Sequence, residues 1–299
     1  MRDSLSKSEE RASYIILVLP ALLLYLFVMA FPSIFSVILS FSNFRGGRLF
    51  ASGALSFGGL RAYRQIFADP YFFIALKNNL YIVLVSVFGQ IPLGFFLAYI
   101  LSRGLIKQTD FFQAVIYLPN VIAAVIIGIL FNRFFLTSNS VWVEVQKYFN
   151  PDYQFMYGKN SMAVILVCIL WMYTGLYMII FLANLQKIDV SIIEASKIDG
   201  ASEMQTLYHI ILPALSGVIV TTAILAISGS LKSFDLIFVM TGGGPAFRTS
   251  VLSIYMYNKA FQGAPNYPVA NAISTVMVVV CFILIGLTRS AEKRFGGRD

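Results

Sequence analysis

The sequence predicts an all-α integral membrane protein with six transmembrane helices. Hydrophobic residues make up 58% of the 299 residues and charged residues only 12%, and the mean hydropathy is +0.78. Soluble domains usually contain about 25% charged residues because their surfaces face water. In addition, six apolar segments are long enough to cross a bilayer as helices.

The predicted spans, in chain order, cover residues 15–39, 80–101, 114–135, 162–183, 214–231 and 269–288. The first contains Pro20 and Pro32 and is too long for the apolar core of a signal peptide, so we expect it to be retained. The second contains Pro92 and Gly94, which predict a kink. The fifth is the most polar, and such a helix is stable in a bilayer where it faces protein or a water-filled cavity.

The basic residues bear on the orientation of these spans. The 22 Lys and Arg residues divide equally between the two sides, but Arg289, Lys293, Arg294 and Arg298 directly follow the last span. Because the positive-inside rule weights short flanking segments, this cluster favours N-in and C-in termini. The predicted regions are a cytoplasmic N-terminal segment (1–14), a six-span transmembrane domain (15–289) and a cytoplasmic basic tail (290–299).

Several function classes are disfavoured by what the chain contains. The net charge of +8 comes from basic residues between apolar blocks, which suits membrane lipid and does not indicate nucleic acid. Cys168 and Cys281 lie in apolar runs, as packed thiols do, so we expect no disulfide or metal site. The single His209 has no partner arrangement typical of catalysis. A phosphate-binding G-x-x-x-x-G-K-[ST] loop is absent, so ATP would have to bind another chain.

Two other classes of membrane protein fit poorly. A membrane enzyme acting on lipid or glycan needs an acid, a base or metal ligands converging at one membrane face, and no such set can be assembled. A stand-alone secondary carrier usually needs an ionisable residue within a span. Here Arg133, Lys232 and Asp235 lie near span ends, and we expect the last two to form an ion pair with each other.

The segment 189–213, between spans four and five, predicts two short amphipathic helices joined by a tight turn at Gly200 and Ala201. Gly200 lies where the first helix must stop, in the left-handed conformation that glycine adopts readily. Pro213 ends the second helix or begins the next span. We call this segment the elbow. A rigid, exposed elbow is typical of a docking surface.

Two pairs in the elbow have the spacing of a capping box, in which two side chains and two backbone amides bond reciprocally. They are Ser191 with Glu194, and Ser202 with Gln205. The spacing leaves two interpretations of Glu194 open. Its carboxylate is either a helix cap and nothing more, or a docking group.

A face of small and polar residues runs along span five. Its members follow at helical spacing and are Thr222, Ala226, Gly229, Ser230 and Ser233. One interpretation is close helix packing through small residues, and the other is a wet substrate pathway. Span four offers aromatic rings, including Tyr173, which can combine a stacking surface with a hydroxyl group.

Motifs along the chain resemble those of a known family. Glu194-Ala195-Ser196, then Gly200, then Ile211-Leu212-Pro213 resemble the EAA loop of ABC importer permeases, and Phe234-Asp235 through Pro245 resembles a segment of carbohydrate permeases. The resemblance covers approximately residues 14–289 and is closest to MalF-like (UgpA-type) subunits, whose fold is called MetI-like. The chain departs from the pattern at Ser196, where the motif has Ala, and at Asp189, where Pro is common.

The resemblance implies a function and its site residues. In that family the EAA loop is cytoplasmic and docks into a cleft of the ATPase subunit, which implies coupling roles for Glu194, Ala195, Gly200, Ala201, Leu212 and Pro213. It also implies that substrate passes the positions occupied here by Met172, Tyr173, Leu176, Gly229, Ser230 and Ser233. The implied substrate is a di- or oligosaccharide, with glycerol phosphate or another polyol derivative as the alternative.

Partners are implied in the same way. They are a second homologous permease subunit, a dimer of nucleotide-binding ATPase subunits that would bind ATP and Mg, and an extracytoplasmic sugar-binding protein. The implied location is the cytoplasmic membrane of a bacterium or archaeon, crossed several times. No cofactor is expected on this chain.

Overall fold

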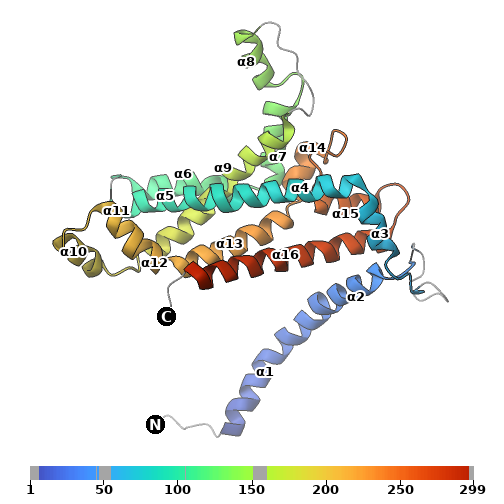
Figure 1. Ribbon diagram of the computed structural model, residues 1–299, viewed down its shortest axis with the longest axis horizontal. Coiled ribbons are helices and arrows are strands. Elements are labelled where there is room, and N and C mark those ends of the chain that lie inside the picture. The colour runs from blue at the N-terminus through green and yellow to red at the C-terminus, as the bar shows by residue number, and fades with distance from the viewer. Residues whose placement is uncertain (1–6, 45, 47–54, 105, 151–159, 296–299) are drawn as a thin grey trace. The chain divides into compact units, whose positions relative to one another are not determined.

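The computed structural model describes residues 7–44, 46, 55–104, 106–150 and 160–295 (Figure 1). These residues are helical, and their β-type pairing is limited to an isolated antiparallel bridge between Ser42 and Phe57. The chain divides into two compact units. The first comprises Met1–Ala68 with Asn258–Val276, and the second comprises Asp69–Tyr257 with Met277–Asp299. The predicted all-α class is confirmed.

The first unit contains α1 (Lys7–Tyr25), the wide-turn segment η1 (Leu26–Ala30), α2 (Phe31–Ser40) and α3 (Arg61–Ala68). Polar contacts join its separate pieces. The Ser36 hydroxyl donates to Asn271 Oδ1 over 2.6 Å, and the Ser40 and Tyr63 hydroxyls lie 2.8 Å apart. The rings of Phe44 and Tyr267 pack with centroids 5.8 Å apart.

The second unit holds the remaining helices. Its first half comprises α4 (Pro70–Val85), η2 (Ser86–Gln90), α5 (Ile91–Ser102), α6 (Thr109–Val121), α7 (Ala124–Phe131), η3 (Asn132–Leu136) and α8 (Val141–Phe149). Its second half comprises α9 (Ser161–Leu185), α10 (Val190–Ile198), α11 (Glu203–Thr206), η4 (Leu207–Ile211), α12 (Leu212–Ala214), α13 (Ser216–Leu231) and α14 (Asp235–Thr241). The helices α15 (Leu252–Phe261) and α16 (Tyr267–Phe295) belong partly to each unit.

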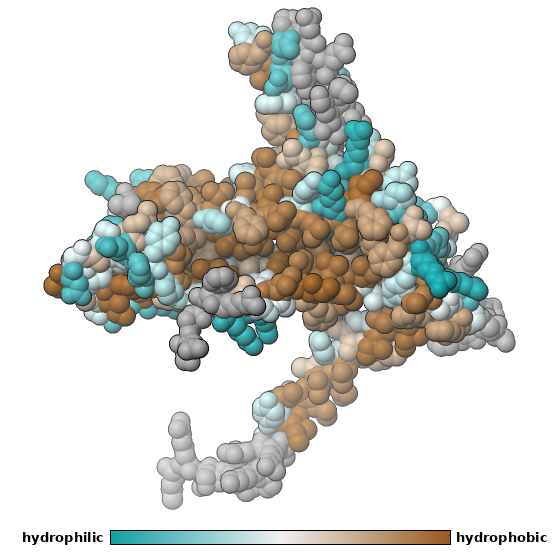
Figure 2. All heavy atoms as spheres, in the orientation of Figure 1, coloured by the Kyte–Doolittle hydropathy of each residue, from teal (hydrophilic) through white to brown (hydrophobic). Residues whose placement is uncertain are grey.

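Within the described residues, five helical stretches are long and apolar enough to cross a membrane, and a bent pair gives a sixth if it is one span. The five are Ser13–Ser40, Pro70–Ser102, Ala124–Phe149, Ser161–Leu185 and Tyr267–Lys293, and the pair is Glu203–Ala214 with Ser216–Leu231, bent by 66°. On the face shown in Figure 2, apolar side chains cover the long helices of the second unit, and hydrophilic ones gather around the elbow. The prediction of a six-span membrane protein agrees with this count.

Prolines follow three of the four wide turns in the described residues, η3 being the exception. In η1, η2 and η4 the backbone forms a wide π-type turn, and the helix that follows each has proline as its second residue: Pro32, Pro92 and Pro213. Proline lacks an amide hydrogen, and its ring clashes with the carbonyl four residues earlier. A widened turn relieves that clash. The wide turn before Pro92 lies where the sequence predicts a kink in span two.

The predicted continuous third span, 114–135, is wrong. The helix α6 ends at Val121, Ile122 and Ala123 are extended, and α7 begins at Ala124. Pro119 leaves a carbonyl of α6 without an amide partner, and the β-branched pair Val121-Ile122 follows it, so the helix is weakest there. The apolar stretch capable of crossing the membrane begins at the break.

The helix α9 is the centre of the second unit, and two glycines allow others to approach it. A Cβ at Gly94 of α5 would lie 2.7 Å from Tyr177 Cβ and 2.9 Å from Met178 N. A Cβ at Gly175 of α9 would collide with the backbone of Ile116 in α6. Close backbone approach through small residues is how membrane helices gain packing energy.

Two buried amides tie α4 to distant backbone. Asn78 Nδ2 donates to the carbonyls of Arg248 and Ser250, over 2.9 and 2.8 Å. Asn79 Nδ2 donates to the Ser230 carbonyl over 3.0 Å, and its Oδ1 accepts from Leu252 N over 2.7 Å. The two amides satisfy backbone groups that have left their helices, at the end of α13 and around the start of α15.

Replacing Asn79 by Ala is expected to destabilise the protein strongly. Asn79 is fully buried, so its loss leaves the Leu252 amide without its partner, at a cost on the order of 1–3 kcal/mol, and removes one of the hydrogen bonds to the Ser230 carbonyl. Thermal unfolding of the detergent-purified protein measures this. Asn184→Ala is the matched control, because the Asn184 amide donates only within its own helix, to the Ile180 carbonyl. Equal melting temperatures for the two variants would contradict the prediction.

Candidate functional site

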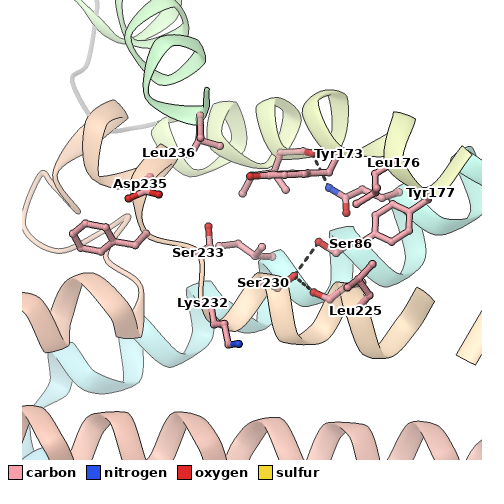
Figure 3. A pocket seen from close by; sticks show the side chains of 17 residues that line it. Ser86, Tyr173, Leu176, Tyr177, Leu225, Ser230, Lys232, Ser233, Asp235 and Leu236 are labelled. Atoms are coloured by element: carbon pink, nitrogen blue, oxygen red, sulfur yellow. Dashed lines mark hydrogen bonds between the residues drawn. The ribbon is translucent and has the colours of Figure 1, made fainter. Parts of the chain in front are cut away.

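A cavity of about 300 Å³ lies in the second unit between span two, α9 and the end of α13 (Figure 3). Its volume is at the lower end of the range for small-molecule sites. Five of the six predicted pathway residues line it: Tyr173, Leu176, Gly229, Ser230 and Ser233. The sixth, Met172, is 3% exposed and belongs to the apolar core instead.

Tyr173 presents both a ring and a hydroxyl to the cavity. It is half-buried, and its hydroxyl points toward the side where Ser233 and Asp235 lie (Figure 3). Across the described part of the chain, the Tyr173 hydroxyl has no hydrogen-bond partner. A half-buried phenol of this kind can stack on an apolar surface and still bond a ligand.

The residues of the predicted polar face differ in their surroundings. A Cβ added at Gly229 would meet nothing within 4 Å, so this residue faces open space. Ser230 is 5% exposed; its hydroxyl donates to the Ala226 carbonyl over 2.7 Å and lies 3.0 Å from Ser86 Oγ. Ser233 follows the end of α13, so it reaches the cavity from a turn and not from the helical face.

Thr222 does not line this cavity. Its hydroxyl donates to carbonyls of its own helix, those of Val218 and Ile219. The small-residue face therefore has two parts. Gly229 and Ser230 line the cavity, Ser230 with its hydroxyl bonded to neighbouring groups, whereas Thr222 bonds only within its own helix.

Sequence reasoning missed the contribution of span two. Ser86 and Gln90, both in the wide turn η2, line the cavity. Gln90 is 1% exposed, and its Nε2 donates to the Ile169 carbonyl over 2.7 Å. The sequence did contain a signal for this contribution: Ser86 and Gln90 are polar residues within the six positions before Pro92, in an otherwise apolar span. A wide turn exposes backbone groups, and polar side chains are needed there.

The expected ion pair between Lys232 and Asp235 is not formed. Both residues line the cavity, but Figure 3 shows Lys232 pointing away from Asp235, and neither has an ion-pair partner among the described residues. The helix α13 ends before Lys232 and α14 begins at Asp235. The predicted spacing assumed one continuous helix.

The elbow has the predicted form of two short helices, α10 and α11, joined at Gly200. Gly200 has φ +81°. Its amide donates to the Lys197 carbonyl, and the amide of Ala201 donates to the Ser196 carbonyl, over 3.1 and 2.9 Å. This pair of bonds is the Schellman closure of a helix. It satisfies carbonyls that would otherwise be free at the end of α10.

The predicted capping box of Ser191 and Glu194 is wrong, and that of Ser202 and Gln205 is confirmed. Asp189 caps α10 instead, accepting from Ser191 N over 2.9 Å. This backbone hydrogen bond lowers the pKa of Asp189. The carboxylate of Glu194 is exposed on the middle of α10 and bonds to no other described residue. Of the two interpretations of Glu194, the helix cap is therefore wrong.

The two departures from the family pattern have local explanations. Asp189 starts α10 by capping it. Ser196 is buried and its hydroxyl lies 3.1 Å from that of Thr206, which joins α10 to α11. Beyond η4, Leu212 and Pro213 form the short α12, and the chain then bends into α13.

A second cavity lies on the elbow. Its volume is about 390 Å³, and it is lined by Asp199, Gly200, Ala201, Gln205, Thr206, His209 and Ile210. His209 Nδ1 lies 3.0 Å from the Gln205 carbonyl oxygen. Within the described residues, no three His, Cys, Asp or Glu side chains are close enough to hold a metal ion.

Comparisons with known proteins identify the family. Residues 90–297 match the model of the binding-protein-dependent transport system inner membrane component. The chain is 31% identical to a probable ABC transporter permease of Pyrococcus horikoshii, over 91% of this chain and 93% of the relative. It is 32% identical to the lactose transport system permease LacF of Rhizobium radiobacter, over 89% of each chain.

The fold has a solved counterpart. A chain of a bacterial ABC transporter involved in the import of the acidic polysaccharide alginate superposes with a TM-score of 0.79, covering 97% of this chain and 98% of that one, at 22% identity. Together with the apolar helices and the elbow, these matches give the class of the protein. The chain belongs to the family of binding-protein-dependent transport system inner membrane components, and it is a multi-pass ABC transporter permease of the cytoplasmic membrane, not an enzyme.

Proposed function

We propose that this chain forms half of the translocation pathway of an ATP-driven importer for a neutral di- or oligosaccharide. The observation that supports the substrate class is the chemistry of the cavity at Tyr173. It offers an aromatic ring, hydroxyls and the Gln90 amide, which suit a neutral polyol. Lys232 also lines the cavity, but its side chain points away from the other labelled side chains (Figure 3), which favours a neutral polyol over glycerol phosphate.

The names of relatives agree with this substrate class. LacF is a lactose transport permease. A relative from Streptococcus mutans, 30% identical over 93% of this chain and 94% of its own, is a multiple sugar-binding transport system permease. In the proposed complex an extracytoplasmic binding protein delivers the sugar, a second homologous permease completes the pathway, and a dimer of ATPase subunits binds ATP and Mg.

The elbow is proposed to be cytoplasmic and to dock on an ATPase subunit. The exposed Glu194, with Ala195 beside it, and the turn at Gly200 and Ala201 form its outer surface. The end of α16, with Thr288, Ala291 and Glu292, lines a groove with Tyr208, Leu212 and Pro213. That end therefore lies on the same side as the elbow, which supports a cytoplasmic position for the start of the basic tail. With an even number of spans, the N-terminal segment is proposed to be cytoplasmic too; residues 1–6 and 296–299 of these two segments lie outside the described residues.

Tyr173→Ala is expected to weaken sugar uptake by roughly 5- to 100-fold at low sugar concentration. The estimate combines a lost stacking surface and a lost hydrogen bond, each worth about 0.5–1.5 kcal/mol. Tyr173→Phe should lose only the hydrogen-bond part. The measurement is uptake by proteoliposomes containing the complete transporter, offered labelled neutral mono-, di- and oligosaccharides and glycerol 3-phosphate.

The control is Tyr81→Ala, which removes a half-exposed tyrosine of α4 that does not line the cavity. Uptake of glycerol 3-phosphate without any neutral sugar would contradict the proposed substrate class. Uptake driven in the absence of the ATPase subunits would contradict the proposed mechanism.

A further inference from the structure

One carboxylate of the elbow joins α11 to two other helices, α5 and α10. Glu203 Oε2 lies 3.1 Å from a guanidinium nitrogen of Arg103 and accepts from the Tyr99 hydroxyl over 3.3 Å. Glu203 Oε1 lies 3.2 Å from Lys197 Nζ. Tyr99 and Arg103 are at the end of α5, Lys197 is in the last turn of α10, and Glu203 begins α11. We call Tyr99, Arg103 and Glu203 the clasp.

The Arg103 side of the clasp is held in place. Its guanidinium lies over the Tyr99 ring, 5.0 Å from the centroid, and also donates to the Tyr99 hydroxyl over 3.1 Å. The Arg103 side chain is only 19% exposed. An isolated exposed ion pair contributes little because ordering two long side chains costs entropy. Here much of that cost is already met by the ring beneath the guanidinium.

The electrostatics agree with the geometry. The pKa of Glu203 is lowered, first by the hydrogen bond from Lys197 and then by the charge of Arg103. The carboxylate is nevertheless 62% exposed, so we expect a small contribution to the stability of the fold. We therefore expect Glu203 to affect the movement of the elbow relative to α5 and to change the free energy of unfolding little.

Apolar packing continues the connection under the clasp. Ile211, near the end of the elbow, and Leu215, just after it, share a core cluster with Leu101 of α5 and Leu185 of α9. Figure 1 shows α11 beside the end of α5. At its other end α5 is continuous with η2, which brings Ser86 and Gln90 to the cavity. One helix therefore links the elbow to the cavity wall.

We propose that the clasp couples the elbow to span two, so that movement of the docked elbow is passed along α5 to Ser86 and Gln90. Glu203 and Arg103 are then positioning residues: they join two elements of this chain and contact neither the sugar nor the nucleotide. The proposal rests on the proposed function, in which the elbow docks on the ATPase and the cavity is the pathway. The proposal gives Arg103, which directly follows span two, a part in coupling ATP hydrolysis to transport.

The test measures motion at the cavity without requiring the sugar. Gly229→Cys, in a chain also bearing Cys168→Ala and Cys281→Ser, is labelled with a water-soluble maleimide in the reconstituted transporter, with and without ATP. Arg103→Met, Glu203→Gln and the double variant are compared in this background. Each single variant should reduce the ATP-dependent change in labelling rate by roughly fivefold or more, the lower end of measured coupling between sites, while ATP hydrolysis continues.

The double variant should be no worse than either single one, because the two residues act as a unit. Glu144→Gln is the matched control: it breaks the exposed Lys147–Glu144 pair of α8, 3.6 Å apart, and should change nothing. If Arg103→Met assembles poorly, Glu203→Gln decides the test alone, because it keeps the size of the side chain and removes its charge. A loss of about fivefold or more in an assembled Glu203→Gln transporter supports the clasp, and a labelling change within about twofold of that in the chain with Glu203 overturns it.

Failure of the clasp and failure of the proposed function give different results. If Glu194→Ala abolishes the labelling change but the Arg103 and Glu203 variants retain it, the clasp is overturned and docking by the elbow stands. Independent, additive losses in the double variant also overturn the clasp. If the thiol introduced by Gly229→Cys never responds to ATP in a chain whose clasp is intact, the assignment of the cavity as the pathway is overturned.

Discussion

Replacing Gly229 by Leu is expected to block uptake while leaving the permease folded and assembled. The added side chain meets no neighbour at its Cβ and extends into a cavity of about 300 Å³. We expect uptake to fall at least about tenfold, equivalent to about 1.4 kcal/mol. The assay is uptake by proteoliposomes of the sugar identified by the substrate panel, with melting temperature measured in parallel.

Gly286→Leu is the matched control for this variant. Gly286 is also in a helix, α16, and a Cβ there also meets nothing within 4 Å, but it does not line the cavity. If both leucines leave uptake unchanged, the cavity is not on the pathway. Ser230→Leu is a poorer probe, because Ser230 is buried and bonded to span two and its replacement should lower stability first.

Glu194→Ala is expected to reduce uptake more than about tenfold without weakening α10, again a loss of about 1.4 kcal/mol or more in coupling. The carboxylate does not cap the helix, and alanine has the higher helix propensity. Under the proposed docking, the lost interaction is therefore the one with the ATPase subunit. Uptake, ATP hydrolysis and the amount of ATPase subunit retained on the purified complex are measured together.

Asp189→Ala provides the contrast, since Asp189 is the actual cap of α10 and its loss costs roughly 0.5–2 kcal/mol of helix stability. Asp189→Ala should therefore lower both stability and uptake, whereas Glu194→Ala lowers uptake alone. Normal transport by Glu194→Ala would mean that the carboxylate has no docking role. Gly200→Val should uncouple ATP hydrolysis from transport for a different reason. A β-branched residue is strained at φ +81°, so the turn between α10 and α11 would change shape.

The membrane class and the elbow were predictable because each rests on local patterns. Long apolar runs identify helices by length alone, and the turn at Gly200 follows from helix-stop chemistry. The predicted start of span two is ten residues late because Asn78 and Asn79 interrupt its apolar run. Their amides are satisfied by backbone more than 150 residues away, which local patterns do not reveal.

The cavity was only partly predictable for the same reason. Tyr173, Gly229 and Ser233 could be named from composition and resemblance, but Met172 lies in the core and Ser86 with Gln90 line the cavity. Ser86 and Gln90 belong to the wide turn before Pro92, and the residues of span two that face the cavity depend on that turn. Likewise, Lys232 and Asp235 do not pair because α13 ends at Leu231, before Lys232, and a new helix begins at Asp235. These outcomes depend on tertiary packing.

The amides of α4 have a consequence for how the protein is made. Asn78 and Asn79 find their partners only when residues 248–252 have been synthesised. At about 5–20 residues per second, the delay is on the order of ten to thirty seconds. During that interval the beginning of span two holds two unsatisfied amides, which are unfavourable within lipid. Water or the insertion machinery must satisfy them, so the first half of span two reaches its final depth only late in translation.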